Sequence, residues 1–311
     1  MPTPPPDSRL LLVCFAAVYL IWGSAFAASK LVVTDLPPLL AGAVRFIAAG
    51  LGLAIVAGVR GARVPTALRE WRHFAVMGLL LIVLSSGINA LAMRDVASNE
   101  SALLNVSSAF WIPLVGMFGA RGHALTRRAV AGLLLGFAGV AFLMWPKSGF
   151  RFEHLGWQLA ILGACLAWGL GTLYYQRIHS QTAPLMFTAL EMLMGGFMLL
   201  AVALVNGDPA RWRPTEPSIG ALVFLTIFSS GVAYAAFGYL MRHTTPARLG
   251  TYAYVNPAVA AIVGWAVLGE AFSGIQLLGT AVILTGVVLI SLPEESEAGC
   301  LPEAPPAEST P

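Results

Sequence analysis

The stretch PLLAGAVRFIAAGLGLAIVAGV at residues 38–59 recurs in altered form as PLMFTALEMLMGGFMLLAVALV at residues 184–205. A constant offset of 146 positions relates the two, and it pairs Pro38 with Pro184, Arg45 with Glu191 and Gly50 with Gly196. The same offset pairs Trp22-Gly23 with Trp168-Gly169, and an offset of 147 pairs Gly132 with Gly279 and Gly139 with Gly286. A drift of one position over half a chain indicates a duplication, because chance matches would scatter.

The composition places this duplicated chain in a membrane. Apolar residues make up 58% of the 311 positions and charged residues 11%, against about 25% charged residues in ordinary soluble domains. Apolar stretches of roughly 18–24 residues are each long enough to cross a hydrocarbon core of about 30 Å. The sequence therefore predicts an all-α integral membrane protein. Its ten predicted transmembrane helices lie near residues 10–28, 38–59, 71–92, 100–119, 128–145, 155–175, 184–205, 218–241, 248–268 and 274–292.

The charges in the predicted loops give an orientation. With the N-terminus inside, eleven arginines lie on the cytoplasmic side and six cationic residues on the other. The positive-inside rule then favours cytoplasmic N- and C-termini in a multi-pass protein of the cell (inner, cytoplasmic) membrane. Because each half has an odd number of spans, the two five-helix repeats are inverted, a geometry that supports alternating access. The predicted parts are a disordered tail 1–9, repeats 10–146 and 147–292, and a disordered acidic, proline-rich tail 293–311.

Several segments carry a resemblance to a known family. They are Ile21-Trp-Gly-Ser-Ala-Phe-Ala-Ala-Ser-Lys30, Asp35-Leu-Pro-Pro-Leu-Leu40, Val44-Arg-Phe46, Val255-Asn-Pro-Ala258 and Leu268-Gly-Glu270. In this order they look like EamA-type carriers of the drug/metabolite transporter superfamily, and the likeness covers about residues 10–292. The resemblance implies ten helices in two inverted five-helix repeats. It also implies transport, commonly export, of small metabolites such as amino acids.

Two positions depart from the repeat. Gly122-His123 stands where the second half has Gly269-Glu270. Phe110 stands where the second half has Pro257, and Pro113 follows one turn later. The fourth predicted helix is therefore expected to bend at a different place from the ninth.

Arg45 and Glu191 are charged residues inside predicted spans, at matching places in the second and seventh helices. A charge that faces lipid costs about 2.5–3.5 kcal/mol for Arg on the insertion scale. One interpretation assigns the two residues to the carboxylate and amino ends of a zwitterionic solute, or assigns Glu191 to carrying a proton. The other is a buried ion pair, or an Arg45 side chain that extends to the nearer interface. We favour the structural interpretation, because an Arg–Glu pair satisfies both of its members.

A second group of candidate solute-binding residues is polar. Tyr252 and Asn256 lie four positions apart on one face of the ninth helix, directly before Pro257. Pro257 has no N–H, so a kink is expected there and Pro257 is a candidate hinge. Asn105 is the repeat match of Tyr252, and Asn89 lies in the third span. An amide inside a membrane needs a partner, so both asparagines are expected to face the protein interior.

The repeated Trp-Gly pairs add candidates. Trp22 and Trp168 are expected either to stack against an apolar or cationic solute, or to pack and anchor as most aromatic residues in spans do. Gly23 and Gly169 are candidate hinges for a rocking motion, or alternatively close-packing contacts. Glycines at helical spacing on the fifth and tenth spans predict helix packing or a homodimer contact.

Three function classes are compatible with this chain: a carrier, an intramembrane enzyme, and a channel or scaffold without alternating access. An enzyme is disfavoured, since the sequence has no His-Glu-x-x-His motif, no Gly-x-Ser-x-Gly elbow and no paired aspartates in its spans. The five histidines lie near span ends or in loops and are predicted to be solvated. The three cysteines predict neither a disulfide framework nor a metal site. Positive cytoplasmic loops explain the net charge of +3 without a nucleic-acid partner.

The sequence therefore predicts a secondary transporter that moves small metabolites across the cytoplasmic membrane by alternating access. Amino acids are the first candidates and export is the expected direction. The predicted partners are a small-molecule solute and the lipid bilayer, and no cofactor is expected. Proton coupling through Glu191, uniport without coupling, and a homodimer stay open at this point.

Overall fold

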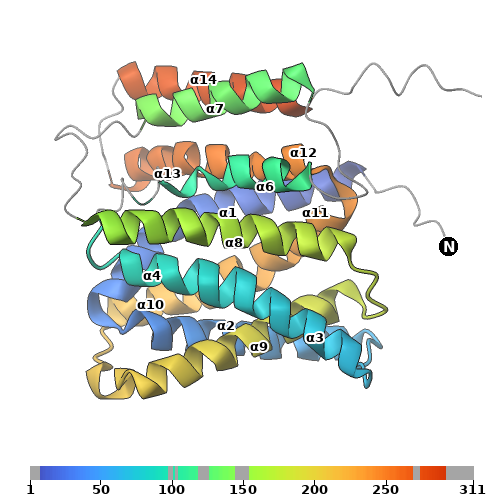
Figure 1. Ribbon diagram of the computed structural model, residues 1–311. Helices are drawn as coiled ribbons and strands as arrows, with labels where there is room; N and C mark the ends of the chain where they lie inside the picture. Colours follow the sequence, from blue (N-terminus) through green and yellow to red (C-terminus); the bar gives the residue numbers. More distant parts are fainter. Residues whose placement is uncertain are drawn as a thin grey trace, which may run out of the picture.

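The computed structural model of the chain describes residues 8–96, 101, 104–117, 126–143, 154–268 and 274–291. Every regular element in these ranges is a helix, as the sequence predicts. Figure 1 shows the helices lying roughly parallel in one bundle. Apart from Ser8 and Arg9, the predicted tails lie outside the described residues, and so do Gly122, His123, Gly269 and Glu270.

Six helical stretches in the described residues are long and apolar enough to span a membrane. Four are single helices: α1 (Ser8–Asp35), α2 (Pro38–Val59), α8 (Leu155–Arg177) and α9 (Pro184–Val205). Two are composite. Leu68–Ala92 consists of α3 (Leu68–Met77), the π-helical segment η1 (Gly78–Gly87) and α4 (Ile88–Ala92). Glu216–His243 consists of α10 (Glu216–Phe224), the π-helical segment η4 (Leu225–Ala233) and α11 (Tyr234–His243).

The remaining helices lie in or beside the other four predicted spans. They are α6 (Ser108–Gly116), α7 (Arg127–Leu143), α12 (Pro246–Gly250), α13 (Tyr252–Leu268) and α14 (Gly274–Ser291). A short 3₁₀ turn, η3 (Asp208–Arg211), follows α9. Several ends of these four spans fall outside the described ranges, so the total of ten spans stays a prediction.

Helices that are related by the repeat begin and end at positions that differ by the repeat offset. The bounds of α2 and α9 differ by 146 positions at both ends, and they coincide with the spans predicted at 38–59 and 184–205. In both helices a proline is the first residue, where its missing N–H costs no intrahelical bond. The two π-helical segments, η1 and η4, also lie 146 to 147 positions apart.

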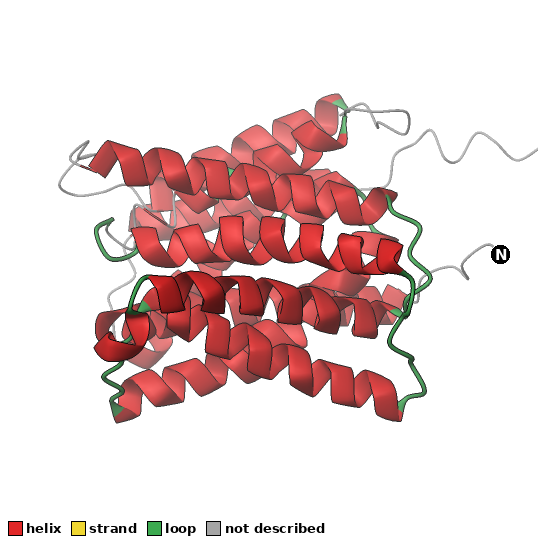
Figure 2. Cartoon of the chain, turned by 60° about the horizontal axis from the view of Figure 1, so that its bottom comes forward, coloured by secondary structure: helices red, strands yellow, loops and turns green. Residues whose placement is uncertain are grey.

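Glycines set the closest approaches between helices of the two halves. A Cβ atom added to Gly132 would lie 2.7 Å from the carbonyl oxygen of Gly286, and one added to Gly139 would lie 2.8 Å from that of Gly279. Helix α7 therefore packs backbone to backbone against α14, and the two lie side by side in Figure 1. Figure 2 shows the described residues as helices joined by loops. The predicted glycine stripes thus serve packing within one chain, while the predicted homodimer stays a prediction.

Two faces of the bundle can be named from its connections. The α1–α2 face carries the turn at residues 36–37, and the α8–α9 face carries the connection at residues 178–183. They lie at the left and right ends of the bundle in Figure 1.

Pro113 and Pro257 both lie inside helices, α6 and α13. In each case the helical pattern is interrupted before the proline, at residues 106–107 and at Thr251, so the two interruptions lie at nearly corresponding positions.

Candidate functional site

A cavity of about 250 Å³ lies within the described bundle and is lined by helices of both halves. It reaches the α1–α2 face, because its lining includes Val33 near the end of α1, Pro38 at the start of α2 and Met93 just after α4. Most of the predicted site residues line it. These are Trp22, Arg45, Asn89, Asn105, Trp168, Tyr252, Asn256 and Pro257.

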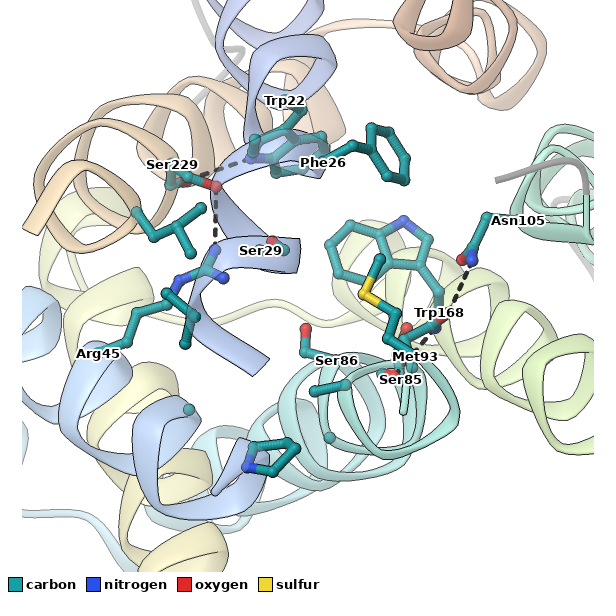
Figure 3. Close-up of a pocket in the computed structure, with 18 of the residues that line it drawn as sticks. Trp22, Phe26, Ser29, Arg45, Ser85, Ser86, Met93, Asn105, Trp168 and Ser229 are labelled. Carbon is teal, nitrogen blue, oxygen red and sulfur yellow. Dashed lines mark hydrogen bonds between the residues drawn. The ribbon is translucent and has the colours of Figure 1, made fainter. Parts of the chain in front are cut away.

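Arg45 is the one charged side chain among the described residues that line the cavity. Its Nε donates to Ser230 Oγ at 2.6 Å and its Nη2 donates to Ser229 Oγ at 2.9 Å. The guanidinium carbon also lies 4.9 Å from the centre of the Phe46 ring, within cation–π distance. Two of the five N–H groups of Arg45 are thereby used, and the partly exposed side chain faces the cavity (Figure 3). The cavity is therefore positively charged.

The π-helical segment η4 supplies the partners of Arg45. Ser229 accepts two hydrogen bonds: its hydroxyl oxygen accepts from Arg45, and its carbonyl oxygen accepts from Trp22 Nε1 at 3.1 Å. Figure 3 shows both hydrogen bonds converging on Ser229. A π-helical turn redirects the backbone groups of the helix, and such turns are frequent at functional sites. Helices α1, α2 and η4 are thus tied together at the cavity wall.

Aromatic rings close the cavity on the side of the α8–α9 face. Trp22 is central to this aromatic floor: its ring centre lies 5.7 Å from Trp168, 5.9 Å from Tyr234, 5.1 Å from Phe237 and 5.3 Å from Tyr252. Most of these contacts are edge-to-face, the geometry that aromatic pairs prefer. The packing prediction for Trp22 and Trp168 therefore holds. Because both also line the cavity, the proposed contact with a solute is compatible with it.

Further polar contacts join the helices beyond the aromatic floor. Tyr19 Oη and Thr251 Oγ1 are 2.5 Å apart, which links α1 to the start of α13. Glu70 accepts hydrogen bonds from Ser180 Oγ and from Thr182 Oγ1, the latter at 2.7 Å, so α3 is held to the α8–α9 connection. These contacts hold α1 to α13, and α3 to the α8–α9 connection, on the side of the α8–α9 face.

His73 corrects one prediction at the same face. Its Nδ1 lies 2.6 Å from Tyr174 Oη, and its Nε2 is buried without a hydrogen-bond partner among the described residues. The prediction that the histidines are solvated is therefore wrong for His73. The second turn of α3, which carries His73, packs against α8, and the position of His73 near a span end did not reveal this contact.

The amide groups gather on the opposite wall. Asn105 Nδ2 donates to Asn89 Oδ1 at 2.7 Å, and Asn89 Nδ2 donates to the carbonyl oxygen of Ser85 at 3.1 Å. Cys165 Sγ lies 3.6 Å from Asn105 Oδ1. Both asparagines thus find partners inside the protein, as predicted, and both line the cavity.

The ninth predicted span contributes Tyr252, Asn256 and Pro257. Tyr252 Oη makes a long contact of 3.5 Å with Ser108 Oγ on α6. When the amide of Asn256 is oriented so that its nitrogen faces the neighbouring acceptors, Nδ2 donates to the carbonyl oxygens of Tyr19 at 3.3 Å and Tyr252 at 3.1 Å. Asn256 therefore bridges α1 and α13, while Pro257 lies beside it in the cavity wall.

Glu191 does not line the cavity. Its side chain is 1% exposed, and neither carboxyl oxygen has a hydrogen-bond partner among the described residues. Because Arg45 is bound to two serines and Glu191 has no partner, the predicted structural ion pair between them is wrong. A single zwitterion held between both charges in this cavity is likewise not supported by the geometry.

The packing of α2 against α9 explains why the two charges do not meet. A Cβ atom on Gly50 would lie 2.9 Å from the carbonyl oxygen of Ala189, and one on Gly196 would lie 2.8 Å from Ile47. The helices are therefore antiparallel, with Arg45 near the level of Gly196. Glu191, which is a full turn earlier in α9, lies nearer the opposite face.

Gly23 and Gly169 lie within uninterrupted helices, away from the cavity lining. A Cβ atom on Gly23 would lie 2.7 Å from Val259, and one on Gly169 would lie 3.2 Å from Trp111. Both contacts fit the alternative of close helix packing. The hinge role of these glycines and of Pro257 stays a prediction.

The sequence reasoning missed several lining residues. Phe26 and Ser29 lie one and two turns after Trp22 on the same face of α1, and Cys165 lies one turn before Trp168. Helical spacing from the two tryptophans would have found them.

Comparison with known proteins identifies relatives along the whole chain. The profile of the EamA-like transporter family matches residues 9–145 and again residues 155–292. The chain is 33% identical over 292 residues to the uncharacterized inner membrane transporter YedA of Escherichia coli (strain K12), which covers 91% of this chain and 92% of YedA. It is 26% identical over 301 residues to the uncharacterized transporter YvbV of Bacillus subtilis (strain 168), covering 94% of each.

A solved structure supports the fold. A protein chain of known crystal structure superposes with a TM-score of 0.78 at 23% sequence identity, covering 92% of this chain and 97% of the other. At this identity the likeness shows the fold alone.

Proposed function

Because the chain belongs to the EamA-like transporter family, we propose that it is a secondary carrier that moves small metabolites across the cytoplasmic membrane by alternating access. It is a membrane transporter and not an enzyme. The observation that carries the proposal is a cavity that reaches the α1–α2 face and is closed toward the other face by the aromatic floor. A binding cavity with access from one side is one state of an alternating-access cycle.

The architecture proposed for this cycle is two inverted repeats, residues 10–146 and 147–292, with cytoplasmic termini. The shared bounds of α2 and α9, the two π-helical segments and the paired glycine contacts of α7 and α14 support it. The family profile also matches twice, once in each half. Under this orientation the cavity faces away from the cytoplasm.

The proposed solute carries a carboxylate, with amino acids as the first candidates. Arg45 is the cationic group in the described cavity wall and keeps N–H groups available beyond those bound to Ser229 and Ser230. Arginine donors match carboxylate oxygens in geometry and charge. The aromatic floor, with Trp22 and Trp168, suits an apolar side chain or an ammonium group over its faces. At about 250 Å³ the cavity suits a small metabolite.

Export and proton coupling are the remaining parts of the proposal. Export follows the direction common among carriers of the family that this chain resembles. Glu191 is the buried carboxyl in the described spans without a partner, and binding and release of a proton there would couple transport to a proton gradient. Uniport is the alternative, and pH-independent exchange would favour it.

Counterflow in proteoliposomes tests the carrier proposal. Vesicles preloaded with a mixture of amino acids are challenged with each labelled amino acid outside. Saturable, transient accumulation is expected, and a channel or scaffold without alternating access would not produce it. If folded protein gives no counterflow with amino acids, the solute class is wrong; if organic anions, nucleosides, organic cations and sugars also fail, the carrier proposal is wrong.

A further inference from the structure

A group of buried polar atoms begins at Tyr234 in the aromatic floor and extends from there toward the α8–α9 face. Both carboxyl oxygens of Glu191 and the hydroxyls of Thr172, Tyr175 and Tyr234 are buried without hydrogen-bond partners among the described residues. The ring of Tyr175 lies 4.8 Å from that of Phe187, one turn before Glu191 on α9. Tyr234 begins α11, which packs against α9, since a Cβ atom on Gly238 would lie 2.9 Å from Thr188 Oγ1. Thr172 lies on the same face of α8, one turn from Trp168 and one turn from Tyr175. We call Thr172, Tyr175, Glu191 and Tyr234 the Glu191 cluster.

Such a cluster is costly to maintain in this state. A buried polar group without a partner loses its hydration and gains nothing in return, and the loss is larger for a carboxylate than for a hydroxyl. Four such residues in one group are unusual, since buried polar groups in native proteins are nearly always satisfied. A ligand or a second conformation is therefore expected to satisfy them.

No cation of the described structure forms an ion pair or a hydrogen bond with the Glu191 carboxyl, although Arg242 acts on it electrostatically from a distance. On α11, Arg242 is exposed, and its guanidinium carbon lies 4.9 Å from the centre of the Tyr175 ring. On α3, His73 is bound to Tyr174 and Glu70 is bound to Ser180 and Thr182.

The other elements packed against α9 bring no cation to Glu191 either, and on α8 the buried Nη2 of Arg177 has no hydrogen-bond partner among the described residues. Arg45 on α2 is bound to Ser229 and Ser230, η1 carries no charged residue, and Arg211 on η3 pairs with Asp208 at 2.8 Å. The ligand that the cluster lacks therefore carries a positive charge.

The repeat relates this cluster to the cavity. Arg45 and Glu191 are each seven positions after the proline that begins α2 or α9, and these helices start at opposite faces. If the two repeats exchange conformations between the two states of the carrier, Glu191 would face the open cavity in the second state as Arg45 faces it in the first. This step rests on the proposed function.

We propose that the Glu191 cluster is a second binding site, open to the α8–α9 face when the cavity is closed, that binds a positive charge. The bound charge is a proton or the ammonium group of the solute. The carrier would then present a cation, Arg45, at one face and an anion, Glu191, at the other. Tyr175 and Arg242 mark the route from the α8–α9 face to this site.

Thiol labelling of the full-length protein in proteoliposomes tests both the access and the charge. The background carries Cys14→Ala, Cys165→Ala and Cys300→Ala. Thr172→Cys reports on the Glu191 cluster, and Ser86→Cys, which lies in the cavity wall, is the matched control. Each is exposed to a cationic and an anionic thiol reagent of equal size, added at either face.

Thr172→Cys is expected to react only from the α8–α9 face, about tenfold faster with the cationic reagent, because a charged recess concentrates opposite charge. Glu191→Gln should abolish that preference. Ser86→Cys should react only from the α1–α2 face and prefer the anionic reagent, and its unchanged reaction in the Glu191→Gln protein shows that this variant is folded. Reaction of Thr172→Cys from the α1–α2 face, from neither face, or without a charge preference would overturn the proposal.

Counterflow separates the two sources of charge. If the solute ammonium is the ligand, Glu191→Gln should slow exchange of an amino acid but not of its deaminated analogue. If a proton is the ligand, the variant should remove the pH dependence of both. Counterflow that Glu191→Gln leaves unchanged at every pH rejects the second site. A lack of counterflow by the unmodified protein with every solute instead rejects the carrier proposal, and the labelling still decides whether the second site exists.

Discussion

Replacing Arg45 by glutamine removes the positive charge of the cavity while keeping a side chain that can hydrogen-bond to Ser229 and Ser230. The guanidinium has five N–H groups and the two serines engage two of them, so donors remain for a solute carboxylate. A hydrogen bond to a charged group contributes about 1.5–3 kcal/mol. Loss of one such contact should weaken solute binding roughly 10- to 150-fold.

The assay is the solute concentration that half-saturates counterflow, measured for an amino acid and for its carboxamide. Arg45→Gln should raise this concentration for the amino acid and leave that of the carboxamide nearly unchanged, because only the carboxylate carries the charge that Arg45 recognises. Arg213→Gln is the matched control. Arg213 is exposed and follows η3, and among the described residues it donates only to the backbone carbonyls of Ala210 and Trp212, so its loss changes the net charge without changing the cavity.

Two results would refute the reasoning. Equal weakening for the amino acid and the carboxamide would mean that Arg45 holds the cavity walls together through Ser229 and Ser230 and does not bind the solute. Equal effects of Arg45→Gln and Arg213→Gln would mean that the net charge of the face matters and the cavity contact does not.

Three further predictions concern packing and access. Gly139→Leu should lower the thermal unfolding temperature in detergent, because a Cβ atom there would lie 2.8 Å from the backbone of α14 and overpacking costs about 1–3 kcal/mol. Gly52→Leu is the control, since no atom lies within 4 Å of a Cβ atom at Gly52. Equal shifts of the unfolding temperature in the two variants would refute the packing argument. Trp22→Ala should allow small solutes to leak from proteoliposomes without saturation, whereas Trp22→Phe should not, because only alanine removes a ring from the aromatic floor. If vesicles with the Trp22→Ala protein do not leak, the aromatic floor is not what closes the cavity. Glu70→Gln should speed the thiol labelling of Thr172→Cys from the α8–α9 face, because it weakens the charge-assisted hydrogen bonds that hold α3 to the α8–α9 connection. An unchanged labelling rate would show that these bonds do not restrain the opening of the α8–α9 face.

Much of the helical framework could be predicted because its signals are local. The predicted spans 38–59 and 184–205 coincide with α2 and α9, since a proline begins each apolar run and charged or polar residues follow its end. The glycine spacing on α7 and α14 also predicted close packing, because only residues without side chains allow backbones to approach so closely.

The site was predicted in part. Trp22, Asn105 and Tyr252 were found because polar and aromatic side chains at repeat-related positions stand out in apolar spans. Ser229 and Ser230 stand out as polar residues of the eighth predicted span, but their pairing with Arg45 was not predicted, because they lie some 185 positions away on a π-helical segment that no local pattern indicates. Nor did the spacing reveal that Glu191 lies apart from the cavity.

The sequence by itself determined that this chain is a helical membrane protein with two related halves, because apolar length, charge exclusion and internal repetition are properties of the order of residues. It also determined how deep Arg45 and Glu191 lie in their helices, since depth follows from position after the first proline. Only the tertiary structure decided which way each side chain faces. That depends on how α2 and α9 pack on their neighbours, and this packing turns Arg45 into the cavity and leaves Glu191 buried beyond the aromatic floor.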